Sequence, residues 1–145
     1  MKLPEYVTVQ EVQRVCRELR IRDWTKMKKP DVMANEARII LQAVNKERMK
    51  ISIEDFRTGL EVELEHGTRF KDANVTNNHP ILTGKIVLAH LKESLDYYMR
   101  LDVAEIEGDL LKAVAGKKPE KVDKYFRKLV KAKLALCKAE ALKVK

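Results

Sequence analysis

The sequence predicts an all-α protein, a single-domain bundle of five to six helices with a central helix at about residues 80–101 and a basic C-terminal helix. Three observations predict this fold class. Turn-forming residues are scarce, with five Gly and four Pro among 145 residues. Leu, Ala, Lys and Glu, which favour helices, are abundant. The alternating run at residues 61–65 continues the helical spacing of Phe56, Leu60 and Leu64, so it does not predict a strand.

Two helices are predicted in the first fifty residues. Thr8 and Glu11 form a capping box, which begins a helix that runs to about Leu19. A short connection with the only Trp follows. Pro30 suits the start of a second helix, roughly residues 31–47. The apolar stripe of this helix is Val32, Ala37, Ile40, Leu41 and Val44.

The third helix is predicted to begin at Ser52, because Asp55 three residues later completes a near capping box. Gly67 is typical of the residue that follows a helix, which places His66 in the last turn. Residues 68–79 then form a polar loop. Loops of this length in helical proteins are either functional or mobile.

Pro80 predicts the start of the fourth helix, which extends to about residue 101. Apolar residues occupy two sides of this helix, one around Ile86 and one around Leu91. A helix that is apolar on two sides is normally central and largely buried. A fifth helix is predicted at residues 103–114, before a glycine.

The net charge of +8 is unevenly distributed. Residues 51–111 carry six basic and twelve acidic side chains, a charge of −6, whereas residues 112–145 carry twelve and three, a charge of +9. This predicts a basic amphipathic helix at residues 117–143, beginning near Pro119. We expect its inward face to be Val122, Phe126, Leu129, Val130, Leu134 and Cys137.

The basic helix suggests two kinds of partner. One hypothesis is non-specific binding to nucleic-acid phosphates, because Lys outnumbers Arg. The residues assigned to it are Lys117, Lys118, Lys121, Lys124, Arg127, Lys128 and Lys131. The alternative is pairing with the acidic middle of the chain, in the same molecule or in a homo-oligomer.

Two His/Glu pairs are the candidates for chemistry. Glu63 and His66 are three positions apart, as are His90 and Glu93, so each pair shares one helix face. Bundles that hold two iron or manganese ions use Glu-x-x-His pairs, and a mononuclear Zn, Fe or Mn site is a second hypothesis. The supporting polar residues would be Glu61, Glu65 and Tyr97. The alternatives are a buried ion-pair network without metal, which we favour, and a ligand pocket.

Several segments together resemble a family of short bacterial and archaeal proteins known as a domain of unknown function. They are Thr8 to Glu11, Leu19 to Trp24, the run Phe56 to Thr68, Asn74-Val75-Thr76, Pro80, Thr83-Gly84-Lys85-Ile86, Ala89-His90-Leu91 and Tyr97-Tyr98. The resemblance covers about residues 8–24 and 53–101, with an extra helix inserted at about 27–50. His79 departs from the family pattern, which has an acidic residue before the proline. The resemblance implies no activity.

The sequence therefore predicts one domain, residues 1–145, without the signature of an enzyme. Thr83-Gly84-Lys85 lacks the second glycine and preceding strand of a phosphate loop, so Gly84 is predicted to admit a neighbouring helix. The two cysteines are not spaced as a C-x-x-C pair. The absence of a signal peptide and of a long apolar run predicts a cytoplasmic protein that does not enter membranes. The favoured function is a non-enzymatic interaction or scaffold protein with a buried His/Glu cluster.

Overall fold

The computed structural model describes residues 6–144, and the prediction of an all-α fold is confirmed over that range. Six α-helices and two short 3₁₀ helices occur among the described residues, and no strand does. The chain divides into two compact units, residues 1–92 and residues 93–145. The expectation that residues 1–145 form one domain stays a prediction.

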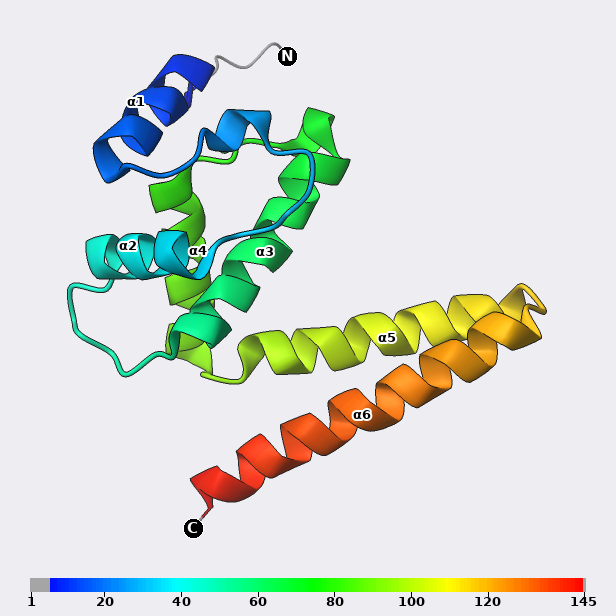
Figure 1. The fold of residues 1–145 in the computed structure, drawn as a ribbon. Helices are drawn as coiled ribbons and strands as arrows, with labels where there is room; N and C mark the ends of the chain where they lie inside the picture. The colour runs from blue at the N-terminus through cyan, green and yellow to red at the C-terminus, as the bar shows by residue number, and fades with distance from the viewer. Residues whose placement is uncertain (1–5, 145) are drawn as a thin grey trace. The chain divides into compact units, whose positions relative to one another are not determined.

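The first unit holds the helices up to the end of α4. These are α1 (Val9–Leu19), η1 (Trp24–Lys26), α2 (Ala34–Val44), α3 (Ile53–Arg69), η2 (Lys71–Ala73) and α4 (Pro80–Glu93) (Figure 1). The predicted N-caps are confirmed. Thr8 Oγ1 accepts a hydrogen bond from the Glu11 amide at 3.2 Å, and Ser52 Oγ accepts one from the Asp55 amide at 3.0 Å.

The core of the first unit contains buried side chains from α2, α3 and α4. Ile40, Phe56 and Val87 are fully buried. A Cβ at Gly84 would lie 2.5 Å from Ile40 Cγ2 and 3.4 Å from Val44 Cγ1. The predicted close approach of a helix at Gly84 is thus confirmed, because only a residue without a side chain leaves room for α2 there.

The predicted end of α3 at Gly67 is wrong. The helix continues through Gly67 to Arg69, and no described glycine has a positive φ. Gly67 is needed because there is no space for a side chain at this position. Its backbone conformation does not require glycine. A Cβ at this position would overlap Asn78 Oδ1 and lie 2.9 Å from Cγ of Asn74, so the glycine lets the following loop approach the helix.

The predicted helix at residues 80–101 is two helices. α4 ends at Glu93, and α5 (Tyr97–Ala115) begins after a turn at residues 94–96. In this turn the Ser94 hydroxyl donates to the Asp96 carboxylate, and the Tyr97 amide donates to the Ser94 carbonyl at 3.1 Å. Ser and Asp side chains form such local hydrogen bonds in competition with the helix, which explains the break.

α4 is buried on one side only, which corrects the prediction of a helix that is apolar on two sides and largely buried. Its buried residues are Pro80, Thr83, Gly84, Val87, Leu88 and Leu91. Ile86, expected at the centre of a buried face, is 37% exposed, and Leu95 in the following turn is 50% exposed.

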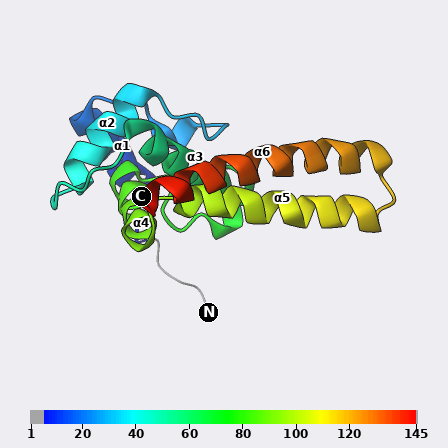
Figure 2. The same cartoon turned by 90° about the horizontal axis from the view of Figure 1, so that it is seen from below.

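The second unit is a helical hairpin. α5 and α6 (Pro119–Lys143) run antiparallel and side by side, joined by a turn at residues 116–118 (Figures 1 and 2). Buried and half-buried side chains alternate at spacings of three and four on both helices, the pattern of a coiled-coil seam. On α5 these are Met99, Val103, Ile106, Leu110 and Ala113, and on α6 they are Val122, Tyr125, Leu129, Ala132, Leu136 and Ala139.

The inward face that we predicted for α6 is wrong for most of its residues. Val122 and Leu129 lie in the seam, but Phe126, Val130, Leu134 and Cys137 are exposed. These side chains form a second apolar stripe along α6. The sequence prediction merged the two stripes into one.

Candidate functional site

The four predicted metal ligands do not gather. His90 Nε2 lies 3.6 Å from Glu63 Oε1, whereas the side chains of His66 and Glu93 are exposed. Among residues 6–144, no group of three or more His, Cys, Asp or Glu side chains is placed to hold a metal ion. Of the four predicted ligands, the structure therefore brings together one His/Glu pair, Glu63 and His90.

The predicted supporting residues have separate partners. Glu61 Oε1 accepts a hydrogen bond from the Val32 amide at 3.1 Å and so ties the segment before α2 to α3. Glu65 forms an ion pair with Arg69 on the same helix. The Tyr97 ring packs edge-on against Tyr98, with ring centroids 5.1 Å apart.

A buried carboxylate that sequence analysis missed is Glu36, which is 1% exposed. It accepts hydrogen bonds from Nε and Nη2 of Arg22, at 3.0 and 2.7 Å, and from the backbone amides of Arg22 and Met33. Burial raises the pKa of Glu36, but these hydrogen bonds outweigh it and hold the pKa below its usual value. The sequence held one signal for this buried carboxylate, because Glu36 lies beside the apolar stripe of the second predicted helix.

The loop after α3 is held by three asparagines. Asn74 Nδ2 donates to the Gly67 carbonyl at 3.2 Å and to Asn78 Oδ1 at 3.0 Å. Asn77 Nδ2 donates to the Val7 carbonyl at 2.5 Å. Asn77 and Asn78 have φ values of 48° and 60°, a left-handed conformation that asparagine adopts more readily than most residues. The loop is therefore tied by hydrogen bonds to the end of α3 and to the residue before the Thr8 cap.

His79 caps α4. Its Nδ1 accepts hydrogen bonds from the amides of Ile81 and Leu82, at 3.2 and 3.4 Å, and Pro80 takes the first helical position. This is the contact that an aspartate makes as an N-cap, so histidine can replace the acidic residue expected here. Burial lowers the pKa of His79, against the effect of Glu11 and together with that of Arg14 and Lys85.

We expect His79→Ala to lower the free energy of unfolding by about 1 kcal/mol at pH 8, and His79→Asn to preserve it. A protonated imidazole cannot accept at Nδ1. Because the folded-state pKa is lowered, the cap stabilises the fold fully above the unfolded pKa of about 6.5 and loses its effect as the pH falls through the folded pKa. Urea unfolding at pH 8 and 5.5 measures this. An equal loss of stability in wild type and His79→Asn would contradict it.

A polar cavity of about 590 Å³ opens beside the asparagine loop. Its lining comes from the start of α1, the segment around η1, the end of α3 and the loop. The lining residues are Val9, Thr25, Lys26, Met27, Lys28, Gly67, Thr68, Lys71, Asn74, Asn77 and Asn78. Sequence analysis singled out the loop by its length but did not associate it with residues 25–28.

Asp96, which lies just before α5, links the start of α5 to the end of α6. Its carboxylate, 3% exposed, lies 3.0 Å from Nη2 of Arg100 on α5 and 3.0 Å from Nζ of Lys143 on α6. Arg100 also contacts Glu140 at 2.7 Å. The hydrogen bonds from Arg100 and Ser94 hold the pKa of Asp96 well below its usual range. We call these five residues the ionic clasp.

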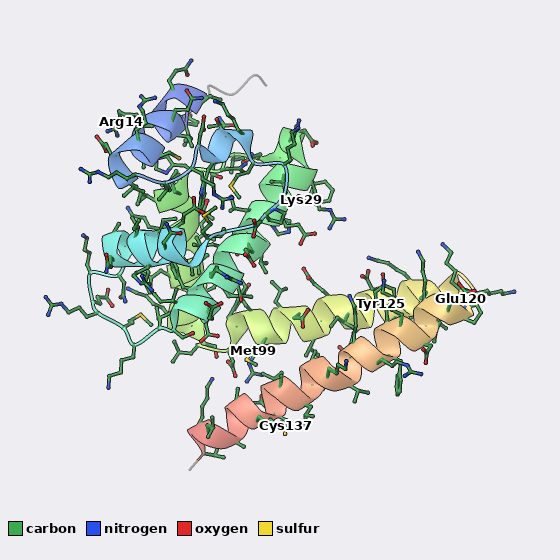
Figure 3. All side chains as sticks on the ribbon, viewed as in Figure 1. Arg14, Lys29, Met99, Glu120, Tyr125 and Cys137 are labelled. Carbon is green, nitrogen blue, oxygen red and sulfur yellow. The ribbon has the colours of Figure 1, made fainter. Side chains whose placement is uncertain are left out.

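The hairpin has a second apolar side, which faces away from the seam. We call it the outer apolar side and define it as Leu111 and Val114 of α5 with Phe126, Val130 and Leu134 of α6. Leu111 is 69% exposed and Phe126 is 57% exposed. Figure 3 shows the side chains along both helices, with Tyr125 and Cys137 labelled on α6.

The seven residues assigned to nucleic-acid binding are all exposed, on α6 and the turn before it. Arg127 forms an ion pair with Asp123 at 2.9 Å, so the charge of Arg127 is partly balanced within the chain. Binding of nucleic acid by these residues stays a prediction. No described helix is both long and apolar enough to cross a membrane.

Comparison with known proteins gives one match. The model of a family described as "Protein of unknown function (DUF5661)" matches residues 12–107, which confirms the resemblance to a domain of unknown function. No curated protein and no solved structure matches the chain significantly. The matched range includes most of the cavity lining and ends within α5, so α6 lies outside it.

Proposed function

This chain belongs to the DUF5661 family, which is described as of unknown function, and we propose that it is an interaction protein that self-associates through its α5–α6 hairpin. The observation that carries the proposal is the outer apolar side. Large apolar side chains exposed in a row on a surface mark interaction sites more often than isolated ones do. The proposed occupant is the hairpin of a second copy, and the product is a four-helix bundle.

The position of the outer apolar side fits a bundle. On a wheel of roughly 100° per residue, Phe126, Val130 and Leu134 lie roughly 90°, 130° and 170° from the mean direction of the seam of α6. In a four-helix bundle the two neighbours of a helix lie roughly 90° apart, so Phe126 and Val130 lie nearest the direction of a second neighbour. The equivalent residues of α5, Leu111 and Val114, point to the same side of the hairpin.

A groove at the turn end of the hairpin supports this placement. It has a volume of about 650 Å³, and its apolar lining residues are Val114, Pro119, Val122 and Phe126, beside Lys117, Lys118 and Asp123. Val114 comes from α5 and the other three apolar residues come from α6, so the apolar side chains of both helices meet on one side. A second hairpin would cover this groove and remove its apolar lining from water.

The charges of the two helices favour a second copy as the partner. α5 carries four acidic and two basic side chains, whereas α6 carries three acidic and eight basic ones. In a twofold dimer each α5 can lie beside the α6 of the partner, because the same surface is used by both copies. Opposite net charges then meet on both sides of the interface.

The test is the molar mass in solution of the full chain, measured by sedimentation over a concentration series to about 100 µM, where an association of micromolar affinity is complete. We expect a dimer for wild type. Phe126→Ser and Val130→Ser should each weaken the dimer about tenfold or more, because each removes one buried apolar side chain from the interface. Both positions are exposed in one chain, so folding should be retained.

Leu142→Ser is the matched control. Leu142 is on the same helix and 72% exposed, but the helical wheel places it away from the outer apolar side. It should leave the dimer unchanged. A wild-type protein that is monomeric at the highest concentration, or a dimer that tolerates both Phe126→Ser and Val130→Ser, would exclude the proposal.

A further inference from the structure

The polar cavity of the first unit is independent of the hairpin and has the features of a ligand site. Its volume of about 590 Å³ lies in the range of small-molecule sites, which is about 300–1,000 Å³. The cavity combines polar and apolar lining, with Met27 and Val9 as its larger apolar side chains.

The charge of the lining indicates the sign of the ligand. Three lysines, Lys26, Lys28 and Lys71, line the cavity, and none of the lining residues is acidic. Lys26 Nζ lies 3.4 Å from an Asp23 carboxylate oxygen. Within residues 6–144, Lys28 and Lys71 form no ion pair. Two uncompensated cations at one cavity attract a ligand that carries about two negative charges.

Hydrogen bonds within the chain hold the wall of the cavity. The Asn74 side chain joins the Gly67 carbonyl to the Asn78 side chain, and Asn77 joins the loop to the residue before the Thr8 cap. Thr25 is fixed in the same way, because its amide and hydroxyl both donate to Asp23. A wall held by such hydrogen bonds needs little ordering on binding, which favours affinity.

We infer that this cavity binds a small phosphomonoester, with Lys28 and Lys71 contacting the phosphate and Met27 contacting the organic part. A phosphomonoester carries close to two charges at neutral pH, matching the two uncompensated lysines. Lysine binds phosphate as a point charge. The cavity is larger than inorganic phosphate requires, so an organic group occupies the remainder.

The experiment is calorimetric titration of the full-length protein with AMP as the probe, beside inorganic phosphate and adenosine. We expect AMP to bind with a Kd below about 1 mM, phosphate to bind more weakly, and adenosine not to bind. Lys28→Gln and Lys71→Gln should each weaken AMP binding about tenfold, as the loss of one charge-assisted contact does. Shifts of the Asn74 and Asn78 side-chain amide signals on titration would locate AMP in the cavity.

Lys29→Gln is the matched control. Lys29, labelled in Figure 3, is in the same segment but lines a neighbouring cavity with Arg22 and Asp31 instead of this one. It should leave AMP binding within about twofold of wild type. Absence of binding by both AMP and phosphate, or equal weakening by Lys29→Gln and Lys28→Gln, would overturn the inference. So would tight binding of single-stranded DNA without a terminal phosphate that competes with AMP, because internal phosphodiesters would then be the ligand.

These results are separable from the test of the hairpin. The cavity residues lie in the first unit and the dimer variants in the second. A monomeric protein that binds AMP would support the ligand site and exclude the dimer. A dimer that does not bind AMP would support the dimer and exclude the ligand site.

Discussion

Glu36→Ala is expected to lower the free energy of unfolding by about 3 kcal/mol. Glu36 is the shared acceptor for the guanidinium of Arg22 and for two backbone amides. Its removal takes this acceptor from all of these donors, although Arg22 Nη2 keeps a second one, the Asp31 carbonyl. Breaking a buried ion pair costs about 3–5 kcal/mol. The lower end applies because the Arg22 side chain is 37% exposed and can recover some hydration. Urea unfolding followed by circular dichroism at pH 7 measures the loss.

Glu65→Ala is the control for this prediction. Glu65 also pairs with an arginine, but its side chain is 42% exposed. The loss should stay below about 1 kcal/mol, as for other surface ion pairs. Equal losses in the two variants would show that burial of Glu36 does not matter.

The second large effect is expected for Gly84→Val, which should destabilise the protein by about 2–3 kcal/mol. The added Cβ would lie 2.5 Å from Ile40 Cγ2 and 3.5 Å from Phe56 Cζ, and both of these residues are fully buried. The neighbours therefore have no space to move into, and overpacking of this kind costs about 1–3 kcal/mol. Thermal unfolding and urea unfolding should both show that Gly84→Val is less stable than wild type.

Gly108→Ala tests the same substitution type where space is free. A Cβ at Gly108 meets no atom within 4 Å, and Gly108 lies in the interior of α5. Alanine should stabilise the helix by about 0.5–1 kcal/mol, because it restricts the unfolded chain more than glycine does. The two glycine variants should thus have opposite signs. Destabilisation by Gly108→Ala would contradict the structure of α5.

Local sequence signals predicted several helix starts correctly, but the start near Pro30 was wrong, because α2 begins at Ala34 with Met33 as its N-cap. Thr8, Ser52 and Pro119 each mark a true N-terminus, because capping depends on residues within one turn. The end of α3 was predicted wrongly at Gly67. A glycine that makes room for a loop and a glycine that ends a helix look the same in the sequence, and only the position of the asparagines distinguishes them.

The candidate site was less predictable than the fold. Helical spacing placed Glu63 and His90 on faces that do meet, but it could not show that His66 and Glu93 are exposed. The cavity joins residues 25–28 to the loop more than 40 positions later, and nothing in either segment alone indicates the other. The two stripes of α6 were also merged, because spacing alone does not say which stripe faces α5.

The ionic clasp has a mechanical consequence. The hairpin is closed covalently at one end by the turn at residues 116–118 and electrostatically at the other by Asp96, Arg100 and Lys143. A force that separates the first turn of α5 from the C-terminal turn of α6 therefore acts first on the clasp. The contacts of the seam then break one after another, from the clasp toward the turn. A force that slides α5 along α6, parallel to the helix axes, would instead act on all contacts of the seam at once. The hairpin should thus be weak in the first direction and strong in the second, with acid or salt lowering the force at which the clasp opens.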